Sequence, residues 1–128
     1  MRILLDTHLV LWWQGMSNRV PAAVRALIDS AAAPPLVSQV SLWEIAIKVS
    51  QGRIKVDLPR FCAKVAEDGF TWLPIEQSHL LQVATVPVYA DHKDPFDRLL
   101  VAQSLAEPLI LLTVDAKLAR YGTTVRVM

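Results

Sequence analysis

Short apolar runs alternate along this chain with longer segments in which apolar side chains recur every three or four positions. The short runs are typical of buried strands, and the longer spacing is typical of amphipathic helices. The pattern predicts strands at Ile3–Leu5, Leu36–Ser38, Thr71–Leu73, Leu109–Thr113 and Thr124–Val127. It predicts helices at Thr7–Gln14, Pro21–Ser30, Gln39–Ser50, Leu58–Asp68, Glu76–Thr85, Asp94–Ala106 and Ala116–Tyr121.

Residues that favour helix ends and helix starts support these boundaries. Gly52 and Gly69 follow two of the predicted helices, where glycine readily adopts the left-handed conformation of a C-terminal cap. Asp94 and Pro95 form a capping residue followed by proline at the first helical position. Because apolar strands alternate with helices, we expect one α/β domain over residues 1–128, with three α/β/α layers around a mainly parallel sheet of four to five strands.

Composition narrows the functional class only slightly. The chain of 128 residues is 53% hydrophobic and 20% charged, which describes an ordered globular domain. Its net charge of +1 argues against a protein that coats nucleic acid through bulk electrostatics, although a nuclease needs only a local basic rim. The single Cys62 cannot form an intrachain disulfide, and no apolar run approaches the ~18 residues of a membrane span, so we expect a cytoplasmic location.

Four acidic residues occupy positions that such a fold would bring together. Asp6 and Asp115 follow two predicted strands, and the carboxyl ends of parallel strands meet at one edge of the sheet. Glu44 lies within an otherwise apolar helical stretch, and Asp97 lies at the third position of the helix that follows Asp94. Clustered carboxylates repel each other and lose hydration, so they favour a divalent cation bound through oxygen. The sequence therefore predicts a metal site of the kind used in phosphate chemistry.

Each acid also has a purely structural explanation. Asp6, Asp94 and Asp115 can cap the helices that follow them. Glu44 can form an ion pair with Lys48 one helical turn later, and Asp97 at the third helical position is stabilised by the helix dipole. Capping and pairing must account for every acid separately, whereas one pocket accounts for the four acids together. We therefore favour the pocket.

Four segments resemble the PIN domain, and within that fold the VapC-type toxins of bacterial type II toxin–antitoxin systems. They are LLDTH (residues 4–8), LWEIAIK (42–48), DPFDRLLVAQ (94–103) and LTVD (112–115). The resemblance covers essentially the whole chain in order and implies a PIN-like α/β/α domain. Carried over position by position, it implies that the catalytic and metal-binding residues are Asp6, Glu44, Asp97 and Asp115.

The resemblance also implies an activity and partners. Members of this group are endoribonucleases that depend on Mg²⁺ or Mn²⁺ and hydrolyse RNA phosphodiester bonds with metal-activated water. A small cognate VapB-type antitoxin inhibits them. They are usually homodimers, and antitoxin arms can join two dimers into a larger assembly.

Other side chains are candidates for supporting roles. Asp94 is expected to shape the pocket as a cap, and the hydroxyl groups of Thr7 and Thr113 can hydrogen-bond the ligand carboxylates. Lys48 and Arg98 are candidates for contacts with substrate phosphates, with ion pairs to nearby acids as the alternative.

Histidine and tryptophan positions lead to further expectations. The three histidines lack the spacing of a metal-binding motif, although His92 can contact the rim of the pocket. Trp12 and Trp13 are adjacent, so one of them can be exposed at an antitoxin or dimer interface, or both can be buried differently. Trp43 and Trp72 are predicted to lie in the core.

Two other classes of protein remain as alternatives. A receiver or phosphatase-like α/β domain also binds Mg²⁺ at strand ends, but it would place a further acid directly beside or two residues after Asp6, where Thr7 and His8 stand. A non-catalytic binding module with the PIN fold would keep the same elements, and only cleavage of RNA distinguishes it from the enzyme.

Overall fold

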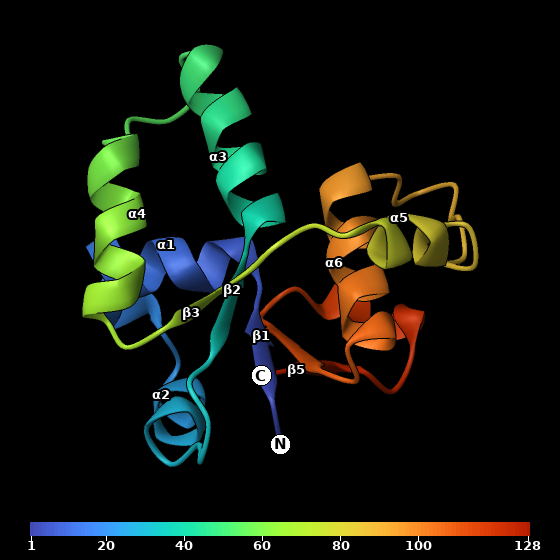
Figure 1. The fold of residues 1–128 in the computed structure, drawn as a ribbon, viewed down its shortest axis with the longest axis horizontal. Helices are drawn as coiled ribbons and strands as arrows, with labels where there is room; N and C mark the ends of the chain where they lie inside the picture. Colours follow the sequence, from blue (N-terminus) through green and yellow to red (C-terminus); the bar gives the residue numbers. More distant parts are fainter.

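A computed structural model describes residues 1–128 as a parallel sheet with helices on both faces (Figure 1). Its strands are β1 (Ile3–Leu5), β2 (Leu36–Ser38), β3 (Thr71–Leu73), β4 (Ile110–Thr113) and β5 (Val125–Val127). The order across the sheet is β3-β2-β1-β4-β5, and every neighbouring pair is parallel. The predicted three-layer α/β/α fold is confirmed, with five strands.

Six α-helices connect and cover these strands, and each lies within a few residues of its predicted position. They are α1 (Thr7–Gly15), α2 (Ala22–Asp29), α3 (Gln39–Ser50), α4 (Leu58–Glu67), α5 (Gln77–Val83) and α6 (Pro95–Ala106). Two 3₁₀ helices complete the fold, η1 (Ser17–Arg19) and η2 (Ala116–Tyr121). The pattern did not predict η1, because a single 3₁₀ turn is too short to show a hydrophobic period. No helix is long and apolar enough to cross a membrane.

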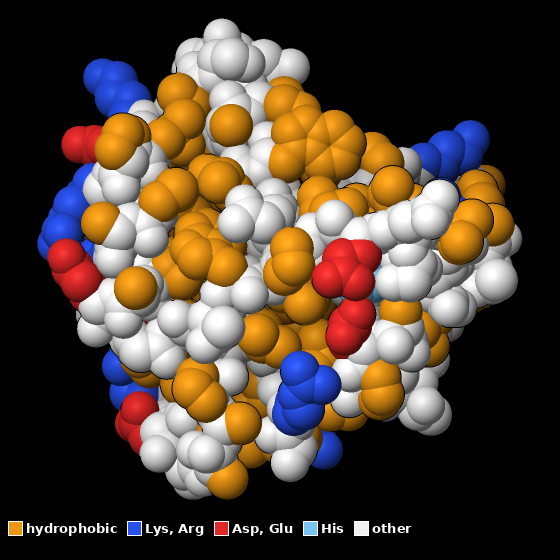
Figure 2. All heavy atoms as spheres, in the orientation of Figure 1, with side chains coloured by type: hydrophobic (Ala, Val, Ile, Leu, Met, Phe, Trp, Pro, Cys, Tyr) orange, Lys and Arg blue, Asp and Glu red, His pale blue; other side chains and the backbone are white.

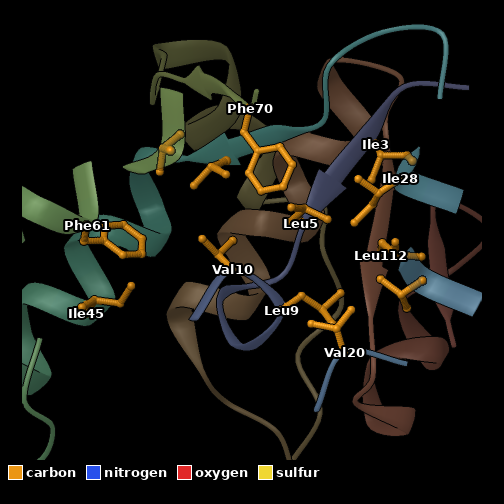
Figure 3. Packing of buried hydrophobic residues seen from close by; sticks show 13 residues of the cluster. Ile3, Leu5, Leu9, Val10, Val20, Ile28, Ile45, Phe61, Phe70 and Leu112 are labelled. Carbon is orange, nitrogen blue, oxygen red and sulfur yellow. The ribbon is translucent and has the colours of Figure 1, made fainter. Parts of the chain in front are cut away.

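The sheet divides the core into two clusters, because successive side chains of a strand point to opposite faces. Ile3 and Leu5 of β1 pack with side chains from α1, α2 and α4 on one face (Figure 3). Leu4 points to the other face and packs with residues of α6 and η2. All three side chains are at least 98% buried, and burial of each stabilises the fold by roughly 1.5–3 kcal/mol. The short central strand is thus held from both sides.

β1 lies at the point where the direction of the chain connections reverses. From β1 the chain passes to β2 and β3 on one side, whereas β4 and β5 lie on the other side. Connections that leave in opposite directions open a crevice at the carboxyl ends of the strands, where ligands of such sheets bind. Leu5 pairs with Leu112 in the β1–β4 register, and Asp6 N–H donates to the Leu112 carbonyl at 3.0 Å. Asp6 therefore lies at this crevice.

The tryptophan positions differ from prediction in one case. Trp43 is 50% exposed, so its predicted place in the core is wrong. It lies on the side of α3 that faces away from the sheet and contacts the edge of Phe96, with 4.9 Å between ring centroids. Figure 2 shows hydrophobic side chains at the surface in this region, between α3 and α6. Trp72 is half-buried and packs against the core.

Trp12 and Trp13 are both half-buried and both pack against the core on the α1 side of the sheet. The guanidinium of Arg19 lies 5.9 Å from the ring centroid of Trp12, and that of Arg25 lies 4.6 Å from Trp13. These cation–π contacts cover part of each ring. Neither side chain is fully exposed, and their use as an interface stays a prediction.

A buried polar network joins α6 to the start of α3. Gln103 is fully buried, and its carbonyl oxygen accepts a hydrogen bond from the Ser38 hydroxyl at 2.6 Å. The Gln103 amide donates to the Pro74 carbonyl at 3.2 Å and lies 3.2 Å from Nδ1 of the buried His79. Ser38 also caps α3 by accepting from the Val40 N–H at 2.9 Å. The network fixes the position of α3 relative to α6.

We expect Gln103→Leu to lower the free energy of unfolding by about 1–3 kcal/mol, because the Ser38 hydroxyl and the Pro74 carbonyl would be buried without partners. Urea denaturation followed by circular dichroism measures the change. Gln77→Leu, the same substitution at an exposed position of α5, is the matched control. Equal stability of the two variants would show that the network contributes little.

Candidate metal centre

A polar cleft of about 350 Å³ lies at the carboxyl ends of β1 and β4. None of the residues that line it is hydrophobic. They are Asp6, Thr7, His8, Glu44, Lys48, Asp91, His92, Lys93, Asp94, Asp97, Asp115 and Lys117. The structure therefore brings the four acids predicted from the sequence into one pocket, together with Asp94 and one further acid.

Asp6 forms the floor of the pocket and is 97% buried. It caps α1, with Oδ1 accepting from the Thr7 N–H at 2.8 Å, and its Oδ2 accepts from the Thr113 hydroxyl at 2.7 Å. Burial raises the pKa of Asp6 above its ordinary value, although both hydrogen bonds act in the opposite direction. The Thr7 hydroxyl is paired with Ser41 at 2.8 Å, so Thr7 holds Asp6 through its backbone and not through its side chain.

Asp115 and Asp94 are helix caps that also line the pocket. Oδ1 of Asp115 accepts from the Lys117 N–H at 3.0 Å, at the start of η2. The Asp115 N–H donates to the Thr113 hydroxyl at 3.0 Å, so this hydroxyl links the carboxylate of Asp6 to the backbone of Asp115. Oδ1 of Asp94 accepts from two N–H groups at the start of α6, at 2.8 and 3.1 Å. The same two residues therefore cap helices and line the pocket.

Glu44 projects into the pocket from α3 and is 95% buried. Its Oε2 accepts from the Lys48 ammonium at 3.0 Å, whereas its Oε1 is buried without any hydrogen-bond partner. A buried, unpaired carboxylate oxygen costs free energy unless another group satisfies it. The arrangement fits a ligand that offers positive charge or a hydrogen bond at this point.

Asp97 lies in the first turn of α6 and experiences the field of the whole cluster. Burial, followed by the charges of Asp6, Asp94, Glu44 and Asp115, raises the pKa of Asp97 to about 8. Because the like charges lie close together, the metal-free pocket favours the protonated form of Asp97. A divalent cation would reverse this effect by favouring the ionised carboxylate.

The donor atoms in the pocket suit a hard cation. His92, Asp97 and Asp115 each offer a ligand atom, and these atoms lie within 4.8 Å of one another. Carboxylate oxygens predominate, which is the ligand chemistry of Mg²⁺ and Mn²⁺. Together with the unpaired Oε1 of Glu44, this donor set fits the predicted metal.

Arg98 lies outside the residues that line the pocket. Its guanidinium donates to backbone carbonyl groups at the end of α5 and in the segment after it, with the shortest distance, 2.8 Å, to Val86. Its position gives no support to the predicted phosphate contact and indicates a structural role. Lys48 does line the pocket, and it also forms the ion pair with Glu44 that was the alternative.

Sequence reasoning gave too little weight to His92. Nε2 of this residue lies 3.2 Å from Oδ2 of Asp97, and the side chain is 9% exposed. Asp91, Lys93 and Lys117 line the pocket as well and were not singled out. In the sequence they are marked only by adjacency, since Asp91 and Lys93 precede the motif at residues 94–103 and Lys117 follows the motif at residues 112–115. Adjacency does not give the direction in which a side chain points.

The fold and the pocket define an α/β domain with a carboxylate-rich pocket at the switch point of its sheet. A family model described as the PIN domain matches residues 3–123, and the chain belongs to the PIN domain family. It is similar to Ribonuclease VapC22 of Mycobacterium tuberculosis (strain ATCC 25618 / H37Rv), with 27% identity over 125 aligned residues. That alignment covers 91% of this chain and 88% of the relative.

Solved structures share this fold, and two of them illustrate the extent of the likeness. VapBC2 from Rickettsia felis, bound to a DNA fragment from their promoter, superposes with a TM-score of 0.68 at 14% identity, over 100% of this chain and 98% of that chain. FitAcB from Neisseria gonorrhoeae superposes with a TM-score of 0.60 at 20% identity, over 91% and 89% of the two chains. These similarities show that the fold is shared.

The raised pKa of Asp97 predicts a pH-dependent stability in the absence of metal. The folded chain holds a proton on Asp97 between pH 3.8 and about 8, where the unfolded chain does not. The contribution of Asp97 to the free energy of unfolding therefore falls as pH rises through this range. The Asp97→Asn variant has no titratable group at this position, so its free energy of unfolding lacks this decrease.

Urea denaturation of both proteins in EDTA, at steps from pH 4 to 9, measures the difference. We expect the stability of the variant relative to wild type to increase with pH and to level off above about 8. Saturating Mg²⁺ should remove the advantage of the variant at the alkaline end. Parallel curves in EDTA would contradict the raised pKa.

Proposed function

We propose that this protein is an endoribonuclease that depends on Mg²⁺ or Mn²⁺ and acts as the toxin of a VapBC-type toxin–antitoxin pair. The observation that carries the proposal is the convergence of Asp6, Glu44, Asp97 and Asp115 in one pocket. Membership of the PIN domain family supports it, as does similarity along nearly the whole chain to a relative named a ribonuclease.

The pocket offers ligands for one or two cations. Asp6, Asp97 and Asp115 would hold the metal, and Glu44 would bind a second ion or orient water through its unpaired Oε1. When bound, the cation offsets carboxylate charge and supplies a water of lowered pKa and charge neutralisation at the reacting phosphate. The Thr113 hydroxyl, by donating to Asp6, restricts rotation of that carboxylate and so prepares the site.

Basic side chains at the same pocket suit an RNA backbone. Three lysines line it, Lys48, Lys93 and Lys117, against six carboxylates. RNA can approach only after cations reduce this excess of negative charge, and the lysines can then contact flanking phosphates. The overall charge of +1 adds little attraction, so selectivity for particular RNA would come from local contacts.

A VapB-type antitoxin is the proposed protein partner, and a homodimer, with larger toxin–antitoxin assemblies, is the proposed quaternary state. Solved structures that share the fold include two named VapBC or VapBC2 and a toxin–antitoxin complex from Klebsiella pneumoniae with a TM-score of 0.64. An antitoxin would keep the pocket from RNA until it is removed. The proposed location is the cytoplasm, where such a toxin would meet RNA.

We expect the purified, antitoxin-free protein to cleave a mixed RNA pool with Mg²⁺ or Mn²⁺ and to be inactive in EDTA. Asp6→Asn should lower the cleavage rate at least about a hundredfold, because loss of a metal ligand should equal or exceed the 10- to 100-fold effect of losing an outer-shell partner. Gel analysis of end-labelled RNA measures the rates, and circular dichroism verifies that the variant is folded.

The matched control is Asp29→Asn, which removes an exposed carboxylate at the end of α2, far from the pocket, and should retain wild-type activity. Full activity of folded Asp6→Asn would refute the assignment of the pocket as the active site. A folded wild-type protein that binds Mn²⁺ but cleaves no RNA in the pool would favour a non-catalytic PIN-fold module.

The toxin assignment has its own test. Induced expression of the wild-type chain in a bacterial host should arrest growth, since uncontrolled RNA cleavage stops translation. Asp97→Asn should have no effect on growth at the same expression level. Growth counts after induction, with immunoblots of both proteins, give the comparison, and equal growth of the two strains would contradict a toxin function.

A further inference from the structure

His92 connects two elements of the pocket through both of its ring nitrogens. Nδ1 lies 2.8 Å from the hydroxyl of Tyr121, at the end of η2. Nε2 lies 3.2 Å from Oδ2 of Asp97, a close polar contact without full hydrogen-bond alignment. His92 and Tyr121 are 9% and 6% exposed, and their rings meet edge to face with 5.6 Å between centroids. The imidazole is therefore confined in one position beside Asp97.

The protonation pattern of this contact follows from the partners. An ionised Asp97, the form that binds a cation, can only accept a hydrogen bond. Two facing lone pairs at 3.2 Å would repel, so Nε2 of His92 carries the hydrogen. In a neutral ring, Nδ1 is then an acceptor. The single hydrogen of the Tyr121 hydroxyl is directed to Nδ1 at 2.8 Å in preference to the His92 carbonyl, which lies farther away at 3.4 Å. An ionised Asp97 thus selects the tautomer that presents an N–H to it, and the Tyr121 hydroxyl accommodates this tautomer by donating to Nδ1.

We propose that His92, held in place by Tyr121, is a positioning residue that orients Asp97 for cation binding. The inference rests on the proposed metal-dependent function. Oδ2 of Asp97 faces the imidazole, which leaves Oδ1 available to a cation. Direct ligation by His92 would require one of its nitrogens to give up its present partner, so His92 acts through Asp97 and does not bind the metal itself.

The segment that carries His92 is fastened to η2, as such a role requires. Asp91 forms an ion pair with Arg120 at 2.6 and 3.1 Å. The Arg120 guanidinium lies 4.6 Å from the ring centroid of Tyr89, a cation–π contact that involves the ring and not the hydroxyl. A β-bridge between Tyr89 and His92 closes the turn. Because η2 begins directly after Asp115, one docked unit places both His92 and a predicted ligand.

Substitutions at His92 can separate this role from simple packing. The side-chain amide nitrogen of Gln can occupy the place of Nε2, whereas that of Asn reaches only the place of Nδ1. His92→Gln therefore retains a donor to Asp97, and His92→Asn and His92→Leu do not. Tyr121→Phe removes the hydroxyl that holds Nδ1 of His92, and Tyr89→Phe removes a hydroxyl that touches neither His92 nor Asp97.

The experiment measures Mn²⁺ affinity of the full chain by titration, with free Mn²⁺ followed by electron paramagnetic resonance. We expect His92→Leu and His92→Asn to bind Mn²⁺ at least about tenfold more weakly than wild type, as is typical when an outer-shell partner is lost. His92→Gln should stay within about threefold of wild type, and Tyr121→Phe should lie between these limits. Tyr89→Phe should bind as wild type does.

Several outcomes would overturn the proposal. Wild-type affinity in folded His92→Leu would do so, as would equal losses in the Gln and Asn variants. Electron spin echo modulation from a directly bound imidazole nitrogen would also overturn it, by showing that His92 is a ligand. The titration contains no RNA, so it tests the metal site separately from the activity. If the Mn²⁺ affinities follow the expected pattern but the wild-type protein cleaves no RNA, the result contradicts the proposed function and leaves the role of His92 intact.

Discussion

Electrostatic repulsion among carboxylates at the ends of β1 and β4 is the constraint on which the organisation of this protein depends. The sheet order brings Asp6 and Asp115 together, and α3 and α6 add Glu44 and Asp97. Burial and mutual repulsion raise the pKa of Asp97 to about 8, so the folded chain holds these groups at a cost in stability. Burial of the hydrophobic core on both faces of the sheet has to offset that cost.

Helix starts and short hydrogen bonds reduce the cost without removing it. Asp6, Asp94 and Asp115 each cap a helix, so three helix N-termini direct partial positive charge toward the pocket. Thr113 and Lys48 add a hydroxyl donor and an ammonium group. The structural and the functional interpretation of these acids are therefore complementary, because a cap occupies only part of the hydrogen-bonding capacity of a carboxylate.

The sequence predicted the elements well because each carries a local cause: apolar strands, caps, and glycines such as Gly52 and Gly69 at positive φ. The four acids were predicted from strand ends and from a charge within an apolar helix. The orientation of Trp43 and of Arg98 was not predicted. The direction of a side chain on a helix depends on how that helix, here α3 or α6, packs against its neighbours. His92 was underrated for a similar reason: its role depends on η2 docking against a segment with no regular pattern.

The hydrogen bond between Thr113 and Asp6 joins residues 107 positions apart. β1 is the first strand of the chain, yet it pairs with β4, and the pocket also needs Asp115. Loop closure over such a distance comes late in folding and requires the segment to exist. A growing chain on the ribosome therefore lacks an assembled acidic pocket until synthesis has passed Asp115, so under the proposed function no nascent fragment carries the complete set of acids.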